Sequence, residues 1–225
     1  MYRSQNPLII LDFDGVLVDS VKIKTDAFIE LYKDFGENVV NKVRSYHLRN
    51  GGISRYEKFR HFHKNYLGIE PNDMILNNLS AKFSDIVAKR VINANEIIGA
   101  EEFLNFCLDS GFCCVVNSAT PRGEIQKIIS KKGWEKYFKK IYGSPASKVE
   151  NIIKAMQIDN FKNINTFFFG DSTNDLFAAD KTSINFIGIN FSNKKNKNFS
   201  NFNNFEDFMK NSLFDDIFEQ YIKNE

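Results

Sequence analysis

The chain has 225 residues, of which 43% are hydrophobic and 26% are charged, as is usual for a globular protein with a buried core. Its 30 lysines and arginines nearly balance 28 aspartates and glutamates, so the net charge of +2 gives no reason to expect a nucleic acid or a membrane as partner. The three cysteines, Cys107, Cys113 and Cys114, do not suggest a disulfide framework. Because no signal peptide or membrane-spanning apolar run is evident, we expect a cytoplasmic protein.

The first predicted element is a strand at residues 7–13, where the apolar run "PLIILDF" is typical of a strand buried on both faces. Similar runs predict further strands at 111–118, 139–143, 164–171 and 184–190. Amphipathic patterns predict helices between them, at 100–110, 121–132, 147–157 and 173–181. This alternation predicts an open parallel α/β sheet with right-handed crossovers.

A purely helical region interrupts that alternation directly after the first strand. Amphipathic patterns predict helices at 21–35, 53–67 and 71–92, with no strand between them. We therefore predict an α/β core formed by residues 1–18 and 96–225, with an all-helical subdomain inserted at 19–95. Near the end of the chain, the Asn/Lys-rich stretch at 193–205 predicts a loop, and a final amphipathic helix is expected at 205–222.

Polar side chains follow three of the predicted strands. Asp12 and Asp14 end the first, Ser118 ends the second, and Asp171 ends another, with Asp175 close behind. Parallel strands end at one edge of an open sheet, where ligands bind. Clustered carboxylates cannot all stay ionised without a cation or a shared proton, and an all-oxygen ligand set suits Mg²⁺, which also contacts phosphate. We therefore predict a Mg²⁺ and phosphate site, in which one aspartate of the first pair is a nucleophile and the other a proton donor.

Four motifs in order, over about residues 6–180, resemble those of the haloacid dehalogenase superfamily of phosphohydrolases. "DFDGVLVDS" resembles the first motif, and "VVNSAT" resembles the second, an apolar strand that ends in Ser or Thr. Lys148, in "GSPASKVENI", lies where the third motif has its lysine, and "GDSTNDLFAA" resembles the fourth. The resemblance implies a Rossmann-like parallel sheet core, and the helical insertion is similar to the cap that closes over the site in many members.

The resemblance also implies catalytic roles. Asp12 would attack phosphorus and form an aspartyl-phosphate, while Asp14 would protonate the leaving oxygen and then activate water. Ser118 and Lys148 would orient the phosphoryl group and the nucleophile. An ionised aspartate needs no base to become a nucleophile, and a lysine with Mg²⁺ would stabilise the charge of the transition state.

Metal and substrate ligands follow from the same resemblance. Asp12, the backbone carbonyl of Asp14, and Asp171 would hold Mg²⁺, with Asp175 supporting them. "GGISR" at 51–55 is similar to a cap loop of β-phosphoglucomutase-like members, whose arginine contacts a distal phosphate. The substrate-binding residues that the resemblance predicts are Asn117, Ala119, Gly52 and Arg55. The three histidines, His47, His61 and His63, are expected to be ordinary residues of the insertion.

The predicted function is that of a Mg²⁺-dependent phosphatase of the haloacid dehalogenase type, which acts on a small phosphorylated metabolite. The alternatives are a sugar phosphomutase of the β-phosphoglucomutase type, suggested by "GGISR", and a non-catalytic binding module that keeps the fold. The third motif lacks the Lys-Pro-x-Pro often found in mutase-like members, which favours the phosphatase. Dehalogenation is disfavoured by Asp14, because a halide leaves without a proton. The positions that carry the chemistry are all filled, which disfavours a silent module.

Overall fold

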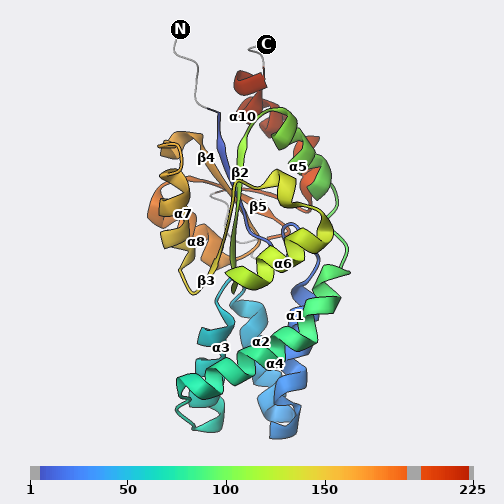
Figure 1. Cartoon of the computed structure of the whole chain (residues 1–225), viewed down its shortest axis with the longest axis vertical. Coiled ribbons are helices and arrows are strands. Elements are labelled where there is room, and N and C mark those ends of the chain that lie inside the picture. The colour runs from blue at the N-terminus through green and yellow to red at the C-terminus, as the bar shows by residue number, and fades with distance from the viewer. Residues whose placement is uncertain (1–5, 192–198, 223–225) are drawn as a thin grey trace.

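The computed structural model describes residues 6–191 and 199–222, and within them six parallel strands form one sheet (Figure 1). Their order is β3-β2-β1-β4-β5-β6. The strands are β1 Leu8–Leu11, β2 Cys113–Pro121, β3 Lys140–Ser144, β4 Thr166–Gly170, β5 Asn185–Ile189 and β6 Ser200–Phe202. Because β1 lies between β2 and β4, the carboxyl ends of these three strands meet at one edge of the sheet.

Helices cover both faces of the sheet. They are α5 Ala100–Asp109, α6 Arg122–Lys132, α7 Lys148–Met156, α8 Thr173–Thr182, α9 Phe205–Met209 and α10 Ser212–Ile222. Alternate residues of β1 point to opposite faces: Leu8 and Ile10 pack in the same cluster as residues of α7 and α8. Ile9 and Leu11 pack in a second cluster that includes residues of α5, α6 and α10.

A helical insertion, residues 21–92, leaves the sheet directly after β1 and extends below it in Figure 1. It contains α1 Val21–Tyr32, α2 Glu37–Arg49, α3 Arg55–Phe62 and α4 Asp73–Ile92. Aromatic residues such as Phe28, Phe59 and Phe83 form its buried centre. The outgoing and returning chains are bonded side by side, from Asp19 N to the Asn95 carbonyl at 2.9 Å. The whole insertion therefore joins the core through two adjacent segments.

The expected fold class is confirmed, and each of the five predicted strands is present. The division into domains at residues 18 and 95 stays a prediction. Within the helical insertion, α2 lies in a stretch for which no helix was predicted. None of the described helices has the length and apolar character needed to cross a membrane.

Two predictions near the end of the chain are wrong. The single helix expected at 205–222 is divided into α9 and α10, because the Asn211 side chain accepts a hydrogen bond from Leu213 N and starts a new helix. Part of the loop expected at 193–205 is strand β6, which pairs with β5. There the Asn201 amide bonds both backbone groups of Phe191, a contact that its composition did not reveal. Residues 193–198 of that loop lie outside the described residues.

Candidate active site

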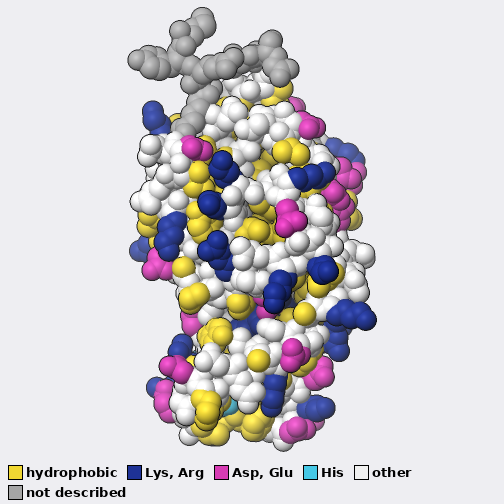
Figure 2. All heavy atoms as spheres, viewed as in Figure 1, with side chains coloured by type: hydrophobic (Ala, Val, Ile, Leu, Met, Phe, Trp, Pro, Cys, Tyr) yellow, Lys and Arg dark blue, Asp and Glu magenta, His cyan; other side chains and the backbone are white. Residues whose placement is uncertain are grey.

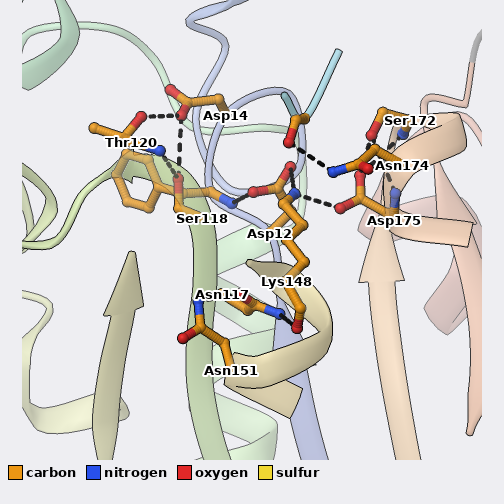
Figure 3. Close-up of polar contacts among 12 residues, drawn as sticks. Asp12, Asp14, Asn117, Ser118, Thr120, Lys148, Asn151, Ser172, Asn174 and Asp175 are labelled. Carbon is orange, nitrogen blue, oxygen red and sulfur yellow. Dashed lines mark hydrogen bonds and ion pairs between the residues drawn. The ribbon is translucent and has the colours of Figure 1, made fainter. Parts of the chain in front are cut away.

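The carboxylate of Asp12 lies at the end of β1 and is 3% exposed (Figure 3). The Nζ atom of Lys148, at the start of α7, lies 3.0 Å from Asp12 Oδ2, and it also bonds Asp175. Burial raises the pKa of Asp12 to about 7, with further increases from the charges of Asp175 and Asp14, while Lys148 opposes the rise. The single cation Lys148 thus offsets only part of the negative charge gathered around Asp12.

Asp14 has a different environment, because four side chains donate to its carboxylate. Ser20 Oγ lies at 2.6 Å and Lys24 Nζ at 2.5 Å, while Thr120 Oγ1 lies at 2.9 Å and Ser118 Oγ at 3.5 Å. Burial pushes the pKa of Asp14 upward, but the charge and hydrogen bond of Lys24, together with hydrogen bonds from Ser20 and Thr120, hold this pKa below its usual value. Two aspartates separated by a single residue therefore have pKa values that their surroundings shift in opposite directions.

Three carboxylates form a possible cation site. Oxygens of Asp12, Asp171 and Asp175 all lie within 4.8 Å of one another. Burial, and then the charge of Asp12, hold the pKa of Asp171 well above its usual range. The ionised form of Asp171 is therefore unfavourable unless a cation lies beside it. The all-oxygen set fits Mg²⁺. Gly15, at φ +85°, leaves space for the Asp171 carboxylate, because a Cβ at this position would lie only 2.3 Å from Asp171 Oδ2.

The carboxylate of Asp14 is not part of this cation site, because it bonds Lys24 instead. The backbone carbonyl of Asp14, which the resemblance implies as a metal ligand, stays a prediction. Asp175 has further structural partners: its carboxylate accepts from Ser172 Oγ at 2.6 Å and from Ser172 N at 3.1 Å. The bond from Ser172 N and the return bond from Asp175 N to Ser172 Oγ, at 3.3 Å, form a capping box that begins α8. Asp175 therefore holds both the start of the helix and Lys148 in place.

Lys148 is held in turn by two asparagines. The Asn117 amide donates to the Lys148 carbonyl at 3.0 Å, and it accepts from Asn151 at 3.0 Å. Asn117 therefore faces α7, whereas the next residue, Ser118, faces Asp14, as the alternation of a strand requires (Figure 3). The predicted role of Asn117 as a substrate contact stays a prediction, and its observed contacts position the lysine.

A cavity of about 700 Å³ lies between the sheet edge and the helical insertion. Asp12, Asp14 and Asp171 line it from the core. Three of the predicted substrate contacts also line it: Gly52, Arg55 and Ala119. The Gly52 carbonyl accepts from Asn174 Nδ2 of α8 at 2.7 Å, which fixes the loop before α3 against the core. The cavity is thus closed on one side by residues of the insertion.

Arg55 forms bonds that the sequence did not predict. Its NH2 group lies 2.7 Å from Glu124 Oε1 of α6, and its NH1 group donates to Ser84 Oγ of α4 at 2.7 Å. Ser84 donates to the other oxygen of Glu124, also at 2.7 Å. These three side chains join the insertion to the core. Arg55 as a contact of the substrate stays a prediction.

Sequence reasoning missed three further polar groups of the cavity: Lys24, Lys58 and Thr120, and it took His47 for an ordinary residue. A signal for the two lysines was present. Lys24 precedes the buried Phe28 and Tyr32 at intervals of four, and Lys58 precedes the buried Phe62 at the same interval. A lysine in the apolar stripe of a helix has to be buried, and a buried lysine usually has a partner or a function.

Similarity to known proteins agrees with this geometry. The sequence profile described as haloacid dehalogenase-like hydrolase matches residues 9–189. The chain belongs to the haloacid dehalogenase-like hydrolase family. The family and enzyme class expected from the four motifs are therefore confirmed. No curated protein matches the sequence.

Solved structures share the fold at low sequence identity. A candidate β-phosphoglucomutase from Bacteroides vulgatus superposes with a TM-score of 0.76 at 16% identity, covering 98% of this chain and 91% of that one. A predicted phosphatase from Clostridium acetobutylicum gives 0.73 at 21% identity, covering 94% and 100%. A candidate hydrolase from Bacillus subtilis with bound magnesium gives 0.65 at 17% identity, covering 92% and 98%. These likenesses establish the fold and leave the substrate open.

Proposed function

We propose that this member of the haloacid dehalogenase-like family is a Mg²⁺-dependent phosphatase, which hydrolyses a small phosphorylated metabolite through an aspartyl-phosphate. The observation that carries the proposal is the geometry of the site: Asp12 and Asp14 face one cavity, and Asp12 gathers with Asp171 and Asp175 into a candidate cation site. Lys148 contacts the proposed nucleophile directly. An interaction protein that merely kept the fold would have no need of these costly buried charges.

In the first step, an oxygen of Asp12 attacks phosphorus, and the bond between phosphorus and the leaving oxygen breaks. Asp14 delivers a proton to that oxygen, which departs as an alcohol. Lys148, fixed by Asp175, holds the attacking carboxylate in place. Thr120 and Ser118 orient Asp14 through their hydroxyl groups. Fixed orientation of the reacting groups supplies a large part of such rate enhancements.

In the second step, Asp14 accepts a proton from a water molecule, which attacks the phosphorus of the aspartyl-phosphate. The bond between phosphorus and the Asp12 oxygen breaks, and inorganic phosphate and the free carboxylate result. The contact of Lys24 with Asp14 supports this step, because it favours the ionised form of Asp14 that acts as a base.

Asp12, Asp171 and Asp175, with the backbone carbonyl of Asp14, would hold Mg²⁺ in this proposal. The ion would neutralise charge on the carboxylates and on the phosphoryl oxygens. The raised pKa values of Asp12 and Asp171 support a site that needs a cation. The roles of the helical insertion as a cap and of Ala119, Gly52 and Arg55 as substrate contacts belong to the same proposal.

A panel of phosphorylated metabolites, assayed for free phosphate with Mg²⁺, tests this function. We expect release from at least one monophosphate without a bisphosphate activator, and p-nitrophenyl phosphate serves as the general substrate. Isomerised sugar phosphate with almost no free phosphate would show a mutase instead. Binding of a phosphorylated compound with no turnover under any condition would show a non-catalytic module.

A further inference from the structure

Four lysine and arginine side chains are buried in the part of the chain that the structure describes. Three have carboxylate partners, in the pairs Lys24–Asp14, Arg55–Glu124 and Lys148–Asp12. The fourth, Lys58 of α3, is 3% exposed and forms no ion pair with any described carboxylate. Lys58 is therefore a buried cation whose anion, by comparison with the other three, is missing from the described protein.

The neighbours of Lys58 orient it toward the cavity. Its Nζ atom lies 2.9 Å from Nδ1 of His47 and 5.7 Å from the centre of the Phe28 ring, and all three residues line the cavity. Because an ammonium group can only donate, Nδ1 of His47 accepts, and the ring proton resides on Nε2. That Nε2 is buried and has no hydrogen-bond partner among the described residues. The nearby Val21 carbonyl makes only a minor contribution, which favours the protonated ring.

A buried Lys58 ammonium without a carboxylate partner destabilises the folded protein when no ligand is bound. Burial, and then the charge of Lys24, lower the pKa of Lys58 to about 7, while the carboxylates of Asp14 and Asp171 act against that fall. An uncompensated buried charge destabilises a fold, and groups that destabilise a fold concentrate at functional sites. The interactions with Asp14 and Asp171 also indicate that Lys58 lies within electrostatic reach of the catalytic edge.

We propose that Lys58 binds a second anionic group of the substrate. The substrate class is then a small phosphate monoester that also carries a carboxylate or a second phosphate. This inference rests on the proposed function, since the first phosphoryl group has to lie at Asp12. The cavity offers the matching polarity, because Asp12, Asp14 and Asp171 line it from the core and Lys58 lines it from the insertion.

Lys58 differs from Arg55, which lies one turn away on α3, in the partners of its charged group. The guanidinium of Arg55 already bonds Glu124 and Ser84. The ammonium of Lys58 has only a neutral histidine and the face of an aromatic ring. An incoming anion thus gains a full charge–charge hydrogen bond at Lys58 without first displacing a carboxylate.

Two matched substrate pairs test this site and distinguish carboxylate from phosphate. Phosphoglycolate is compared with ethyl phosphate, and fructose 1,6-bisphosphate with fructose 1-phosphate, by kcat/KM in Mg²⁺. We expect the wild-type enzyme to prefer the doubly anionic member of at least one pair. In Lys58→Met that preference should fall about 10- to 100-fold, whereas Lys58→Arg should retain most of it. Lys64→Met, an exposed lysine paired with Glu70, is the control and should change nothing.

Several outcomes would overturn the inference. Absence of any preference in both pairs would do so, as would a preference that Lys58→Met leaves intact. Stability provides a second readout: because Lys58 lacks a carboxylate partner, Lys58→Met should unfold at the same temperature as wild type or higher. A lower unfolding temperature would instead assign Lys58 a structural role. If Lys58→Met is too unstable for kinetic assays, Lys58→Gln serves for the substrate comparison, and the loss of stability still counts against the inference.

Failure of the proposed phosphatase activity is a distinguishable result. If the wild-type protein releases no phosphate from p-nitrophenyl phosphate or the four compounds, the phosphatase proposal fails. The anion site is then tested by calorimetric binding of phosphoglycolate and fructose 1,6-bisphosphate. Weakening of either interaction by Lys58→Met, and not by Lys64→Met, would still support the site, while no effect on both would reject it.

Discussion

The catalytic edge of the core and the buried face of the helical insertion both hold charges away from water, but they do so differently. At the core edge, Asp12, Asp171 and Asp175 gather negative charge around one lysine. In the insertion, Lys58 and Arg55 bring positive charge to the same cavity. In the function proposed above, the first region supplies the residues of the reaction itself, and the second supplies Lys58, which binds part of the substrate. We therefore expect changes at the core edge to affect all substrates and a change at Lys58 to affect only some.

The largest effect should come from Asp12→Asn. A carboxamide has nearly the same shape but is a poor nucleophile, so turnover of every substrate should fall by at least about 10³-fold. The variant should stay folded, as judged by circular dichroism. Phosphate release at more than a small fraction of the wild-type rate would show that Asp12 is not the nucleophile. The core edge would then not be the region whose changes affect every substrate.

Most of the catalytic edge could be predicted from the sequence, for a physical reason. Asp12, Ser118 and Asp171 each follow an apolar run, and parallel neighbouring strands place such positions at one edge. The pairing of β1 with β2 and β4 is thus enough to bring them together. Short-range features, such as a strand followed by a polar residue, are visible along the chain itself.

The cavity side of the insertion could not be predicted in the same way. Lys58 and His47 come from α3 and α2, and their contact depends on how these two helices pack. Arg55 was assigned to the substrate by resemblance, but its partners Ser84 and Glu124 are 29 and 69 residues away. Nothing local to Arg55 specifies an ion pair at that distance. Packing between helices, rather than any motif, decides these contacts.

Metal removal should have the next largest effect, and it should act on the core edge alone. Excess chelator should lower the turnover of all substrates by at least about 10²-fold, and Mg²⁺ should restore it. Ca²⁺ should restore it poorly or inhibit, because it takes more ligands at longer distances. Full activity in chelator would contradict the cation site at Asp12, Asp171 and Asp175.

Arg55→Ala should have a smaller effect, on stability first. The variant leaves Glu124, whose side chain is 12% exposed, without its cation, so the free energy of unfolding should fall by about 3 kcal/mol. Arg55→Met combined with Glu124→Gln removes both charges and should recover much of that loss. Additive losses in the double variant, measured by denaturant unfolding, would contradict a coupled pair.

The same Arg55→Ala variant also tests its predicted substrate contact. If Arg55 only joins the insertion to α6, then kcat/KM should fall equally for phosphoglycolate and p-nitrophenyl phosphate. A loss confined to phosphoglycolate would show that Arg55 binds the substrate's second anionic group. The ion pair with Glu124 leads us to expect equal losses, in contrast to the selective loss expected for Lys58→Met.

The last prediction concerns stability rather than turnover, and its dependence on pH at the core edge. The folded protein raises the pKa of Asp12 from 3.8 to about 7, chiefly by burial. A carboxyl with a raised folded pKa favours folding below its unfolded pKa, and that contribution is lost as pH rises through the folded pKa. In metal-free buffer, Asp12→Asn should therefore become progressively more stable than wild type between about pH 4 and pH 7. The slope should approach 1.36 kcal/mol per pH unit. Asp180→Asn, at an exposed position of α8, is the control and should show no such trend. A stability difference between Asp12→Asn and wild type that is flat across this range would contradict the raised pKa.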